Sequence, residues 1–262
     1  MKRFITGLGI GLLFACAYAI GQGQLADQAT SMTLYDENGN AFTFPDTTGP
    51  VIVNSTEIMV LKDEFPPSVA SGEIGELGWN VFDGSAVVVL GETNHPGIVE
   101  NLSDAGSGDE SALFLKSSTS LGYIVPTDVA NMTFILRVND TADLNVWVGI
   151  LEDVDSDTPT DGVWFEFRPG TSANWVTVTE SADTQTANTT SVAVGTDWHK
   201  LEMVRLSNGN WEFYIADVLQ FTHSTNLPTV ASSPTFTVEK TTATNKSIDV
   251  DYFSMTSNVL TR

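Results

Sequence analysis

The sequence predicts an all-β protein, and three observations carry this prediction. Short runs rich in Val, Ile, Thr, Phe and Trp recur after Gln24, with apolar and polar residues in alternation. That alternation places every second side chain on the same face of a strand. Clusters of Gly, Asn, Asp and Pro separate the runs, as is typical of sandwiches and barrels. Sustained helical periodicity is absent from the same region. We therefore expect antiparallel sheets with one apolar face each.

The first segment is predicted to be an export signal. Lys2 and Arg3 precede the uncharged stretch 4–20, and Ala17-Tyr18-Ala19 has small residues at the spacing that signal peptidase recognises. We predict a signal peptide over residues 1–19 and a secreted or surface-displayed product. A lipoprotein anchored through Cys16 and an uncleaved membrane anchor are the two alternatives.

The composition excludes one large class of partner. The chain has 11 Lys and Arg residues against 33 Asp and Glu residues, which gives a net charge of −22 and a pI near 4.1. Removal of Lys2 and Arg3 with the signal would change this charge to −24. Nucleic-acid binding requires a basic surface, so we expect no nucleic-acid partner. Cys16 is the only cysteine, so the mature chain must be stabilised by its core rather than by a disulfide.

A β-hairpin is predicted near the N-terminus. The short strands 34–36 and 41–44 flank Glu37-Asn38-Gly39-Asn40, in which Asn-Gly favours a tight hairpin turn. With a strand over 51–61, this hairpin forms a predicted extension over residues 20–62. Phe65-Pro66-Pro67 then interrupts strand pairing, since proline lacks the backbone donor. The main domain is predicted over 63–256 and a short tail over 257–262.

The main domain is predicted to be a sandwich of about a dozen strands. Its clearest strands are 132–138, 146–150, 163–167, 199–206, 211–216 and 247–255. The residues expected to face the core are Phe134, Leu136, Val148, Phe165, Phe213 and Ile215. The polar stretches 103–109 and 181–190 are predicted as surface loops. In the last strand we expect Val250 and Tyr252 on one face and Asp251 and Phe253 on the other.

Particular segments resemble known proteins. Trp198-His199-Lys200-Leu201, 211–215 and 248–253 resemble the final strands of concanavalin A-like lectin/glucanase (laminin G-like) jelly rolls. The runs 62–65, 71–79, 94–98 and 161–167 are similar to modules of bacteriophage virion and tail-fibre proteins and of bacterial surface proteins. This resemblance implies two curved antiparallel sheets and, in many members, glycan or surface binding.

The motifs of common hydrolases are missing. Glucanases of this superfamily carry Glu-x-Asp-x-Glu on one strand, because residues two apart face the same side. No Glu in this chain has an Asp two positions later, and the chain has no Gly-x-Ser-x-Gly. These absences favour a protein that is not an enzyme, with a polysaccharide hydrolase or lyase whose site is unidentified as the alternative.

Three tryptophans are the candidates for stacking against a sugar ring. Trp147 and Trp164 alternate with apolar residues on their strands, so they would line the outer face of a sheet, and Trp175 is the third candidate. Packing beneath a loop or a neighbouring subunit is the alternative role for the first two. The other large tryptophans, Trp79, Trp198 and Trp211, are expected in the core.

Two polar residues complete the predicted binding set. Glu166 shares a strand face with Trp164 and Arg168, where an ion pair with the neighbouring cation is the alternative to a functional role. His95 lies beside Glu92 in a predicted turn, where hydrogen bonding to the backbone is its alternative role.

Calcium is the metal that the sequence suggests. Asp153, Asp155 and Asp157 alternate in one predicted loop, and Ca²⁺ prefers several such oxygens. The loop is not an EF-hand, because Thr158 replaces the required glycine and Trp164 stands where a bidentate Glu belongs. A solvated acidic loop is the alternative.

The leading hypothesis is an exported, non-enzymatic β-sandwich that binds a glycan or another cell-surface polymer. A charge of −24 would repel anionic polymers, so neutral glycans are the expected partners. The alternative without a ligand is a structural subunit of a virion or a surface assembly, such as a spike or fibre head. In that case the N-terminal extension would mediate homo-oligomerisation.

Overall fold

The computed structural model describes residues 32–35, 41–44, 58–65, 74, 75, 77, 79–92, 95–103, 110–115, 124–152, 159–242 and 244–258. The chain divides into two compact units, residues 1–51 and 52–262. In the first unit, β1 (Met32–Tyr35) pairs antiparallel with β2 (Ala41–Phe44). This pairing confirms the predicted N-terminal hairpin. The predicted signal segment lies outside the described residues.

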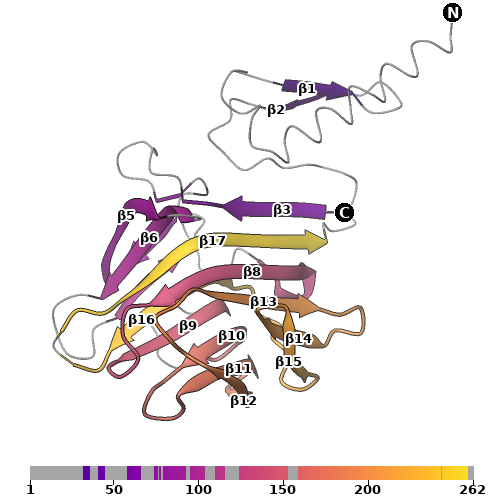
Figure 1. Ribbon diagram of the computed structural model, residues 1–262. Coiled ribbons are helices and arrows are strands. Elements are labelled where there is room, and N and C mark those ends of the chain that lie inside the picture. The colour runs from indigo at the N-terminus through magenta and orange to yellow at the C-terminus, as the bar shows by residue number, and fades with distance from the viewer. Residues whose placement is uncertain are drawn as a thin grey trace, which may run out of the picture. The chain divides into compact units, whose positions relative to one another are not determined.

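The second unit is a sandwich of two antiparallel sheets, which confirms the all-β prediction (Figure 1). Among the described residues, the first sheet has seven strands. In spatial order they are β12 (Thr184–Ala193), β11 (Asn174–Ser181), β10 (Gly162–Phe167), β9 (Leu144–Leu151), β16 (Ser233–Lys240), β7 (Glu110–Phe114) and β4 (Asn80–Phe82). We call it the seven-stranded sheet.

The second sheet, called the eight-stranded sheet, is likewise counted over the described residues. Its order is β15 (Val218–His223), β14 (Trp211–Ile215), β13 (His199–Arg205), β8 (Val129–Val138), β17 (Ser247–Asn258), β6 (His95–Ser103) and β5 (Gly84–Glu92), with β3 (Ile58–Asp63) as a further partner of β17. One 3₁₀ turn, η1 (Pro126–Asp128), leads into β8. Within the described part of the chain, no helix is long and apolar enough to cross a membrane.

The core lies between the two sheets and contains the residues that alternation predicted. All six expected core residues are at most 3% exposed, which confirms their inward orientation. Trp79 and Trp211 join the same core, also as predicted. Trp79 packs against Phe65, Phe236 and Phe253, with ring centroids 5.8, 5.3 and 5.1 Å away. Because Phe236 lies on β16 and Phe253 on β17, this one indole contacts both sheets.

The carboxylate of Asp63 holds that tryptophan in place. Asp63 is fully buried and is the last residue of β3. Its Oδ1 accepts a hydrogen bond from the Phe65 backbone N–H at 2.8 Å. Its Oδ2 accepts from the Leu77 N–H and from Trp79 Nε1, both at 3.0 Å. The three hydrogen bonds stabilise the buried Asp63 carboxylate. They also satisfy three N–H donors that would otherwise lack a partner.

The extension ends earlier than the sequence predicted. The strand expected at 51–61 as part of that extension is β3, which pairs with β17 from Asp63↔Phe253 to Ile58↔Asn258. Figure 1 shows β3 beside β17, and β17 beside β8. The boundary between the two units therefore lies near residue 51 rather than 62. Sequence alone gave no sign that this strand has a partner almost 200 residues later.

Two further predictions in the sandwich were wrong. The polar stretch 181–190 was expected to be a loop, yet it is mostly the edge strand β12, joined to β11 by a turn at Ala182 and Asp183 with φ of 50° and 62°. An edge strand exposes side chains widely, so it needs no apolar alternation. In β17, the register shifts between Val250 and Tyr252. This bulge turns Phe253 into the core and Tyr252 away from it, the reverse of the prediction.

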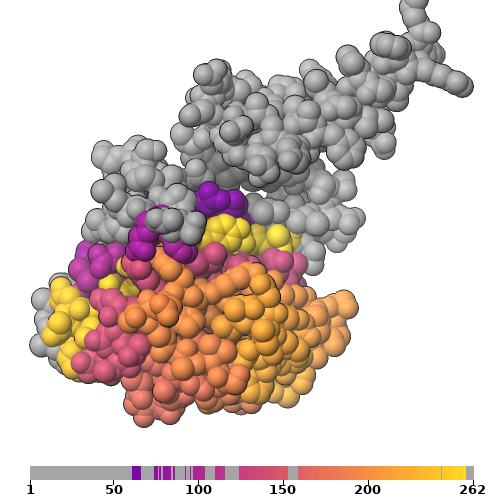
Figure 2. Space-filling model, viewed as in Figure 1, coloured from indigo at the N-terminus to yellow at the C-terminus, as the bar shows by residue number. Residues whose placement is uncertain are grey.

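His223 links β15, the edge strand of the eight-stranded sheet, to the seven-stranded sheet. It lies on β15 and is 1% exposed. Its Nε2 is 3.0 Å from Thr177 Oγ1, and its Nδ1 is 3.0 Å from Thr179 Oγ1, both on β11. The edge strands β12 and β15 are also bridged by Ser191 Oγ, which donates to Gln220 Oε1 at 3.2 Å. In Figure 2, residues drawn in orange, which include β15, form much of the lower part of the face toward the viewer.

Replacement of the Asp63 carboxylate should destabilise the sandwich. In Asp63→Asn, an amide NH₂ replaces one acceptor oxygen, so at least one buried donor loses its partner. We expect the free energy of unfolding to fall by about 3 kcal/mol in urea denaturation. The control is Asp217→Asn, which removes an exposed ion pair with Lys200 and should cost less than about 1 kcal/mol. Equal effects of the two changes would refute the role of Asp63.

Protonation of His223 should weaken the fold in mild acid. Burial lowers the pKa of His223 to about 4, against about 6.5 in an unfolded chain. The unfolded state therefore binds the proton first, and stability should fall as the pH drops from about 6.5 to about 4. The variant His223→Gln lacks this titrating group, so its stability should not show this pH dependence. The difference in unfolding free energy between wild type and variant should shrink across that window, and an unchanged difference would contradict the prediction.

Candidate binding site

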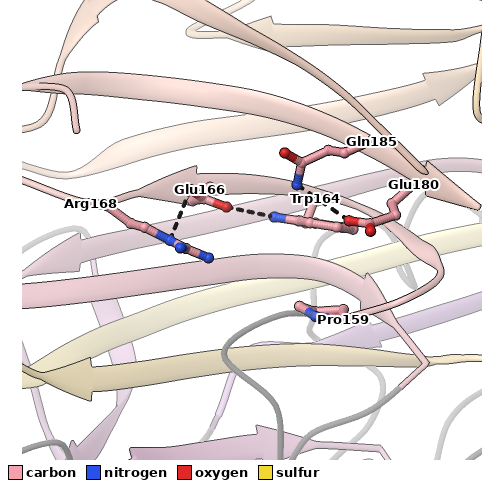
Figure 3. A pocket seen from close by; sticks show the side chains of 6 residues that line it. All are labelled: Pro159, Trp164, Glu166, Arg168, Glu180 and Gln185. Atoms are coloured by element: carbon pink, nitrogen blue, oxygen red, sulfur yellow. Dashed lines mark hydrogen bonds and ion pairs between the residues drawn. The ribbon is translucent and has the colours of Figure 1, made fainter. Parts of the chain in front are cut away.

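A pocket of about 250 Å³ opens on the outer face of the seven-stranded sheet (Figure 3). The residues that line it are Pro159, Trp164, Glu166, Arg168, Glu180 and Gln185. In the close view, the Trp164 ring lies between Glu166 and Glu180. The pocket is therefore a small polar hollow with one aromatic wall.

Strand geometry brings these residues together. Trp164 and Glu166 are two apart on β10, so they share its outer face, and Arg168 follows directly after the strand. Glu180 is paired in register with Gly162 on β10, and Gln185 with Glu180 from β12. Three adjacent strands thus supply most of the lining, and the connection between β9 and β10 adds Pro159.

Two glycines make room for the Trp164 ring. Gly149 is the cross-strand partner of Trp164 on β9. A Cβ atom at Gly149 would lie 2.6 Å from Trp164 Cα and 2.7 Å from Trp164 Cβ. A Cβ atom at Gly162 would lie 3.3 Å from two carbons of the Trp164 ring. The indole therefore lies against bare backbone and is only 1% exposed.

Glu166 is the centre of the polar contacts on β10. Trp164 Nε1 donates to Glu166 Oε2 at 3.3 Å, and Arg168 Nε lies 3.0 Å from Glu166 Oε1. The Arg168 guanidinium also lies over the Trp147 ring, with its Cζ 4.9 Å from the ring centroid. Both oxygens of Glu166 are therefore engaged, and the Trp147 ring helps to hold Arg168 at the pocket.

Glu180 provides the second carboxylate. Its Oε2 accepts a hydrogen bond from Gln185 Nε2 at 3.3 Å, and the residue is 9% exposed. Burial raises the pKa of Glu180, and the nearby charges of Asp183, Asp161 and Glu166 raise it further, against the Gln185 hydrogen bond, which lowers it. The pocket is therefore acidic around Glu180.

This arrangement is suited to binding polar groups. Carboxylate oxygens accept hydrogen bonds, whereas the Gln185 amide and the Arg168 guanidinium donate them. Glu166 is held in place by an ion pair with Arg168 and by the indole N–H of Trp164. The pocket offers both acceptors and donors to a hydroxylated ligand, with Trp164 and Pro159 as apolar walls.

The structure brings part of the predicted binding set together. Trp164 and Glu166 line the pocket, and Trp147 lies beneath Arg168 on the same sheet face. Both tryptophans lie on the predicted outer face, yet each is 1% exposed, and with Leu151, Val176 and Val178 they form a small apolar cluster. Neither ring offers an open face for stacking, so they fit the alternative role of packing.

Trp175 was assigned to the binding set wrongly. It is fully buried in the main core, where its ring contacts Phe165 and Phe167 with centroids 6.3 and 6.2 Å away. Its indole is therefore on the inner face of β11, one residue out of phase with Val176, Val178 and Glu180. A ligand outside the sandwich has no access to it.

His95 lies on the other sheet, and Trp198 comes directly before β13 of that sheet. His95 begins β6 rather than lying in a turn, and its Nδ1 is 2.9 Å from Asp251 Oδ2. Trp198 was expected in the core, but it is half-buried and stacks on His95 with centroids 4.2 Å apart. Arg137 lies over the same indole and pairs with Glu92 at 2.5 Å. His95 therefore lies outside the pocket and belongs to a separate polar cluster.

The predicted calcium ligands Asp153, Asp155 and Asp157 lie outside the described residues, so that site stays a prediction. Within the described ranges, no group of three or more His, Cys, Asp or Glu side chains is placed to hold a metal ion. The residues that flank the loop are anchored, since Thr160 Oγ1 donates to Glu152 Oε2 at 2.6 Å.

Sequence reasoning missed Glu180, Gln185 and Pro159. Gln185 was missed because its strand was taken for a loop. Glu180 carried a usable signal, since it continues the alternation of Val176 and Val178 on β11. Pro159 carried none, because its place depends on a hairpin connection that the sequence does not define.

The Gly149 contact gives a test of how the pocket wall is built. Gly149→Ala would force the β10 backbone and Trp164 away from β9. We expect the free energy of unfolding to fall by about 1–3 kcal/mol, as in other overpacked sites. The matched control is Gly170→Ala, where a Cβ meets no atom within 4 Å, and denaturation should show almost no change. If Gly149→Ala is as stable as this control, the close packing is not as described.

Comparison with known proteins places the sandwich among lectin-like folds. SO2946 from Shewanella oneidensis MR-1, a protein of unknown function, has 14% identity and a TM-score of 0.59, covering 80% of this chain and 90% of that one. The Emp47p carbohydrate recognition domain has 10% identity and a TM-score of 0.52, covering 79% and 99%. The binding domain of botulinum neurotoxin DC, solved with rat synaptotagmin II, has 12% identity and a TM-score of 0.50, covering 75% and 47%.

These similarities confirm the lectin-like jelly roll that the sequence resemblance implied, and at such identities they concern the fold alone. No curated protein matches the chain. Residues 94–251, more than half of the chain, match the family described as SO2946-like, C-terminal domain. The chain therefore belongs to the SO2946-like C-terminal domain family.

Proposed function

We propose that this protein is a non-enzymatic glycan-binding β-sandwich that takes a non-acidic sugar unit in the pocket beside Trp164. The observation that carries the proposal is the pocket itself, in which the Glu166 and Glu180 carboxylates and the Gln185 amide face one small hollow. A sugar hydroxyl both donates and accepts a hydrogen bond, so it needs partners of both kinds.

The size and charge of the pocket narrow the ligand. A volume of about 250 Å³ is just below the roughly 300–1,000 Å³ of typical small-molecule sites, so the pocket fits one sugar unit rather than a long chain segment. The net charge of −22 opposes the approach of anionic polymers. A non-acidic glycan with one unit seated in the pocket meets both conditions.

The fold supports the same proposal. The Emp47p structure is named as a carbohydrate recognition domain, so a sandwich of this shape is compatible with sugar binding. An exported location, which the N-terminal segment predicts, would bring the protein to extracellular or cell-surface glycans. Against an enzyme, both oxygens of Glu166 are occupied by Arg168 and Trp164, which leaves this carboxylate poorly placed as a nucleophile or base.

A glycan array followed by isothermal titration calorimetry tests the proposal. We expect binding to a non-acidic glycan, and we expect Gln185→Ala to weaken it about tenfold, because one or two hydrogen bonds to the sugar are lost. Gln220→Ala is the control, since Gln220 is a hydrogen-bonded glutamine on the edge strand of the other sheet. No binding to any glycan, with stable oligomers in light scattering, would instead favour the structural-subunit alternative.

A further inference from the structure

We propose that the pocket selects sugar units that carry a free ammonium group over the same sugars with a hydroxyl or an acetylated amine. The inference rests on the proposed function, because it names the class of glycan that the same pocket takes. It follows from the balance of charge around Glu180.

Among the described lining residues, one negative charge is uncompensated. Arg168 is the only cation among the six lining residues, and it is paired with Glu166 at 3.0 Å. Glu180 has the neutral Gln185 as its hydrogen-bond partner. An incoming ligand therefore meets one neutralised carboxylate and one carboxylate that lacks a countercharge in the lining.

The surroundings of Glu180 add to this negative charge. Besides the paired Glu166, the charged residues that act on Glu180 are Asp183 and Asp161. Asp161 is 2% exposed, and its Oδ1 accepts from the backbone N–H groups of Thr229 and Val230 at 3.0 and 3.2 Å. These neutral donors hold the Asp161 carboxylate close to the pocket without cancelling its charge.

An ammonium group meets the chemistry of this site. It carries three N–H donors and a positive charge, and it would bond to the Glu180 carboxylate as a charge-assisted pair. Such a pair is stronger at a site that is 9% exposed than at an open surface. The raised pKa of Glu180 is in accord with a carboxylate that lacks a cation. An acetylated amine has no charge and is bulkier, so it would lose both advantages.

A free hexosamine fits better than a bare metal ion or a basic peptide. The described residues hold no group of three acidic or His side chains placed for a metal. The remaining lining, with Gln185, Arg168 and the Pro159 ring, offers hydrogen bonds and an apolar edge that sugar hydroxyls and ring carbons use. A lysine side chain would satisfy Glu180 but would make no use of these further groups.

The experiment compares sugars that differ at a single substituent. The full chain is titrated calorimetrically with β-1,4-linked tetrasaccharides of glucosamine, N-acetylglucosamine and glucose, and with galactosamine, N-acetylgalactosamine and galactose. We expect the amine form in at least one set to bind about tenfold more tightly than its two counterparts. The preference should weaken as the salt concentration rises.

Two matched variants identify the residue responsible. Glu180→Gln should reduce the amine preference, measured as the ratio of amine-form to hydroxyl-form affinity, to less than about twofold. Glu239→Gln is the control, because Glu239 also accepts an amide hydrogen bond, from Asn145 at 2.7 Å, on the same sheet but outside the pocket lining. This control should keep the full preference.

The outcomes separate the two proposals. Equal binding of amine and hydroxyl forms, or an amine preference that survives Glu180→Gln, overturns the inference and leaves glycan binding in place. If pentalysine binds as tightly as the amine sugars, the inference that the preferred ligand is an amino sugar is overturned. Absence of binding to these sugars and to every glycan on the array overturns the proposed function itself.

Discussion

The sandwich depends on the buried carboxylate of Asp63 and on the indole that it holds. Phe65 and Trp79 lie after β3 in the sequence, and the Trp79 ring packs between Phe236 of β16 and Phe253 of β17. Three hydrogen bonds, from the Phe65 and Leu77 backbone N–H groups and from Trp79 Nε1, hold these residues on the Asp63 carboxylate. Gly75 contributes by its lack of a side chain, since a Cβ there would lie within 3 Å of three Asp63 atoms. The segments 62–65 and 71–79, which carry the family resemblance, therefore contain the residues that meet around the Asp63 carboxylate.

Alternation was a sufficient guide wherever a strand is apolar on one face and regular along its length. Phe134 and Phe165 were placed correctly for that reason. The prediction failed where a long-range or local irregularity decides the outcome. The bulge between Val250 and Tyr252 occurs where β6 gives way to β3 as the partner of β17. The residues of β17 themselves do not reveal that the partner of this strand changes from β6 to β3. The strand β12 was missed for a different reason. It is an edge strand, which needs no apolar face, so its sequence lacks the alternation by which the other strands were found.

The pocket was half predictable. Spacing of two put Trp164 and Glu166 on one strand face, and their shared environment follows from that alone. The low exposure of Trp164 could not be predicted from this spacing. It results from close packing against Gly149 on the neighbouring strand β9 and Gly162 at the start of β10. Glu180 and Gln185 reach the same hollow only because β11 and β12 continue the sheet in a particular register. That register is a property of the folded sheet rather than of any one segment.

Most of the pocket lining lies on strands rather than on loops, and this has a consequence for how a ligand would bind. β10, β11 and β12 are hydrogen-bonded to one another along their lengths, and their lining side chains are already in mutual contact. Little chain entropy remains to be lost when the pocket fills. Association would then proceed in one step, at a rate set by diffusion and orientation rather than by a rearrangement of the protein. Differences in affinity between ligands would accordingly appear in how long each one stays bound.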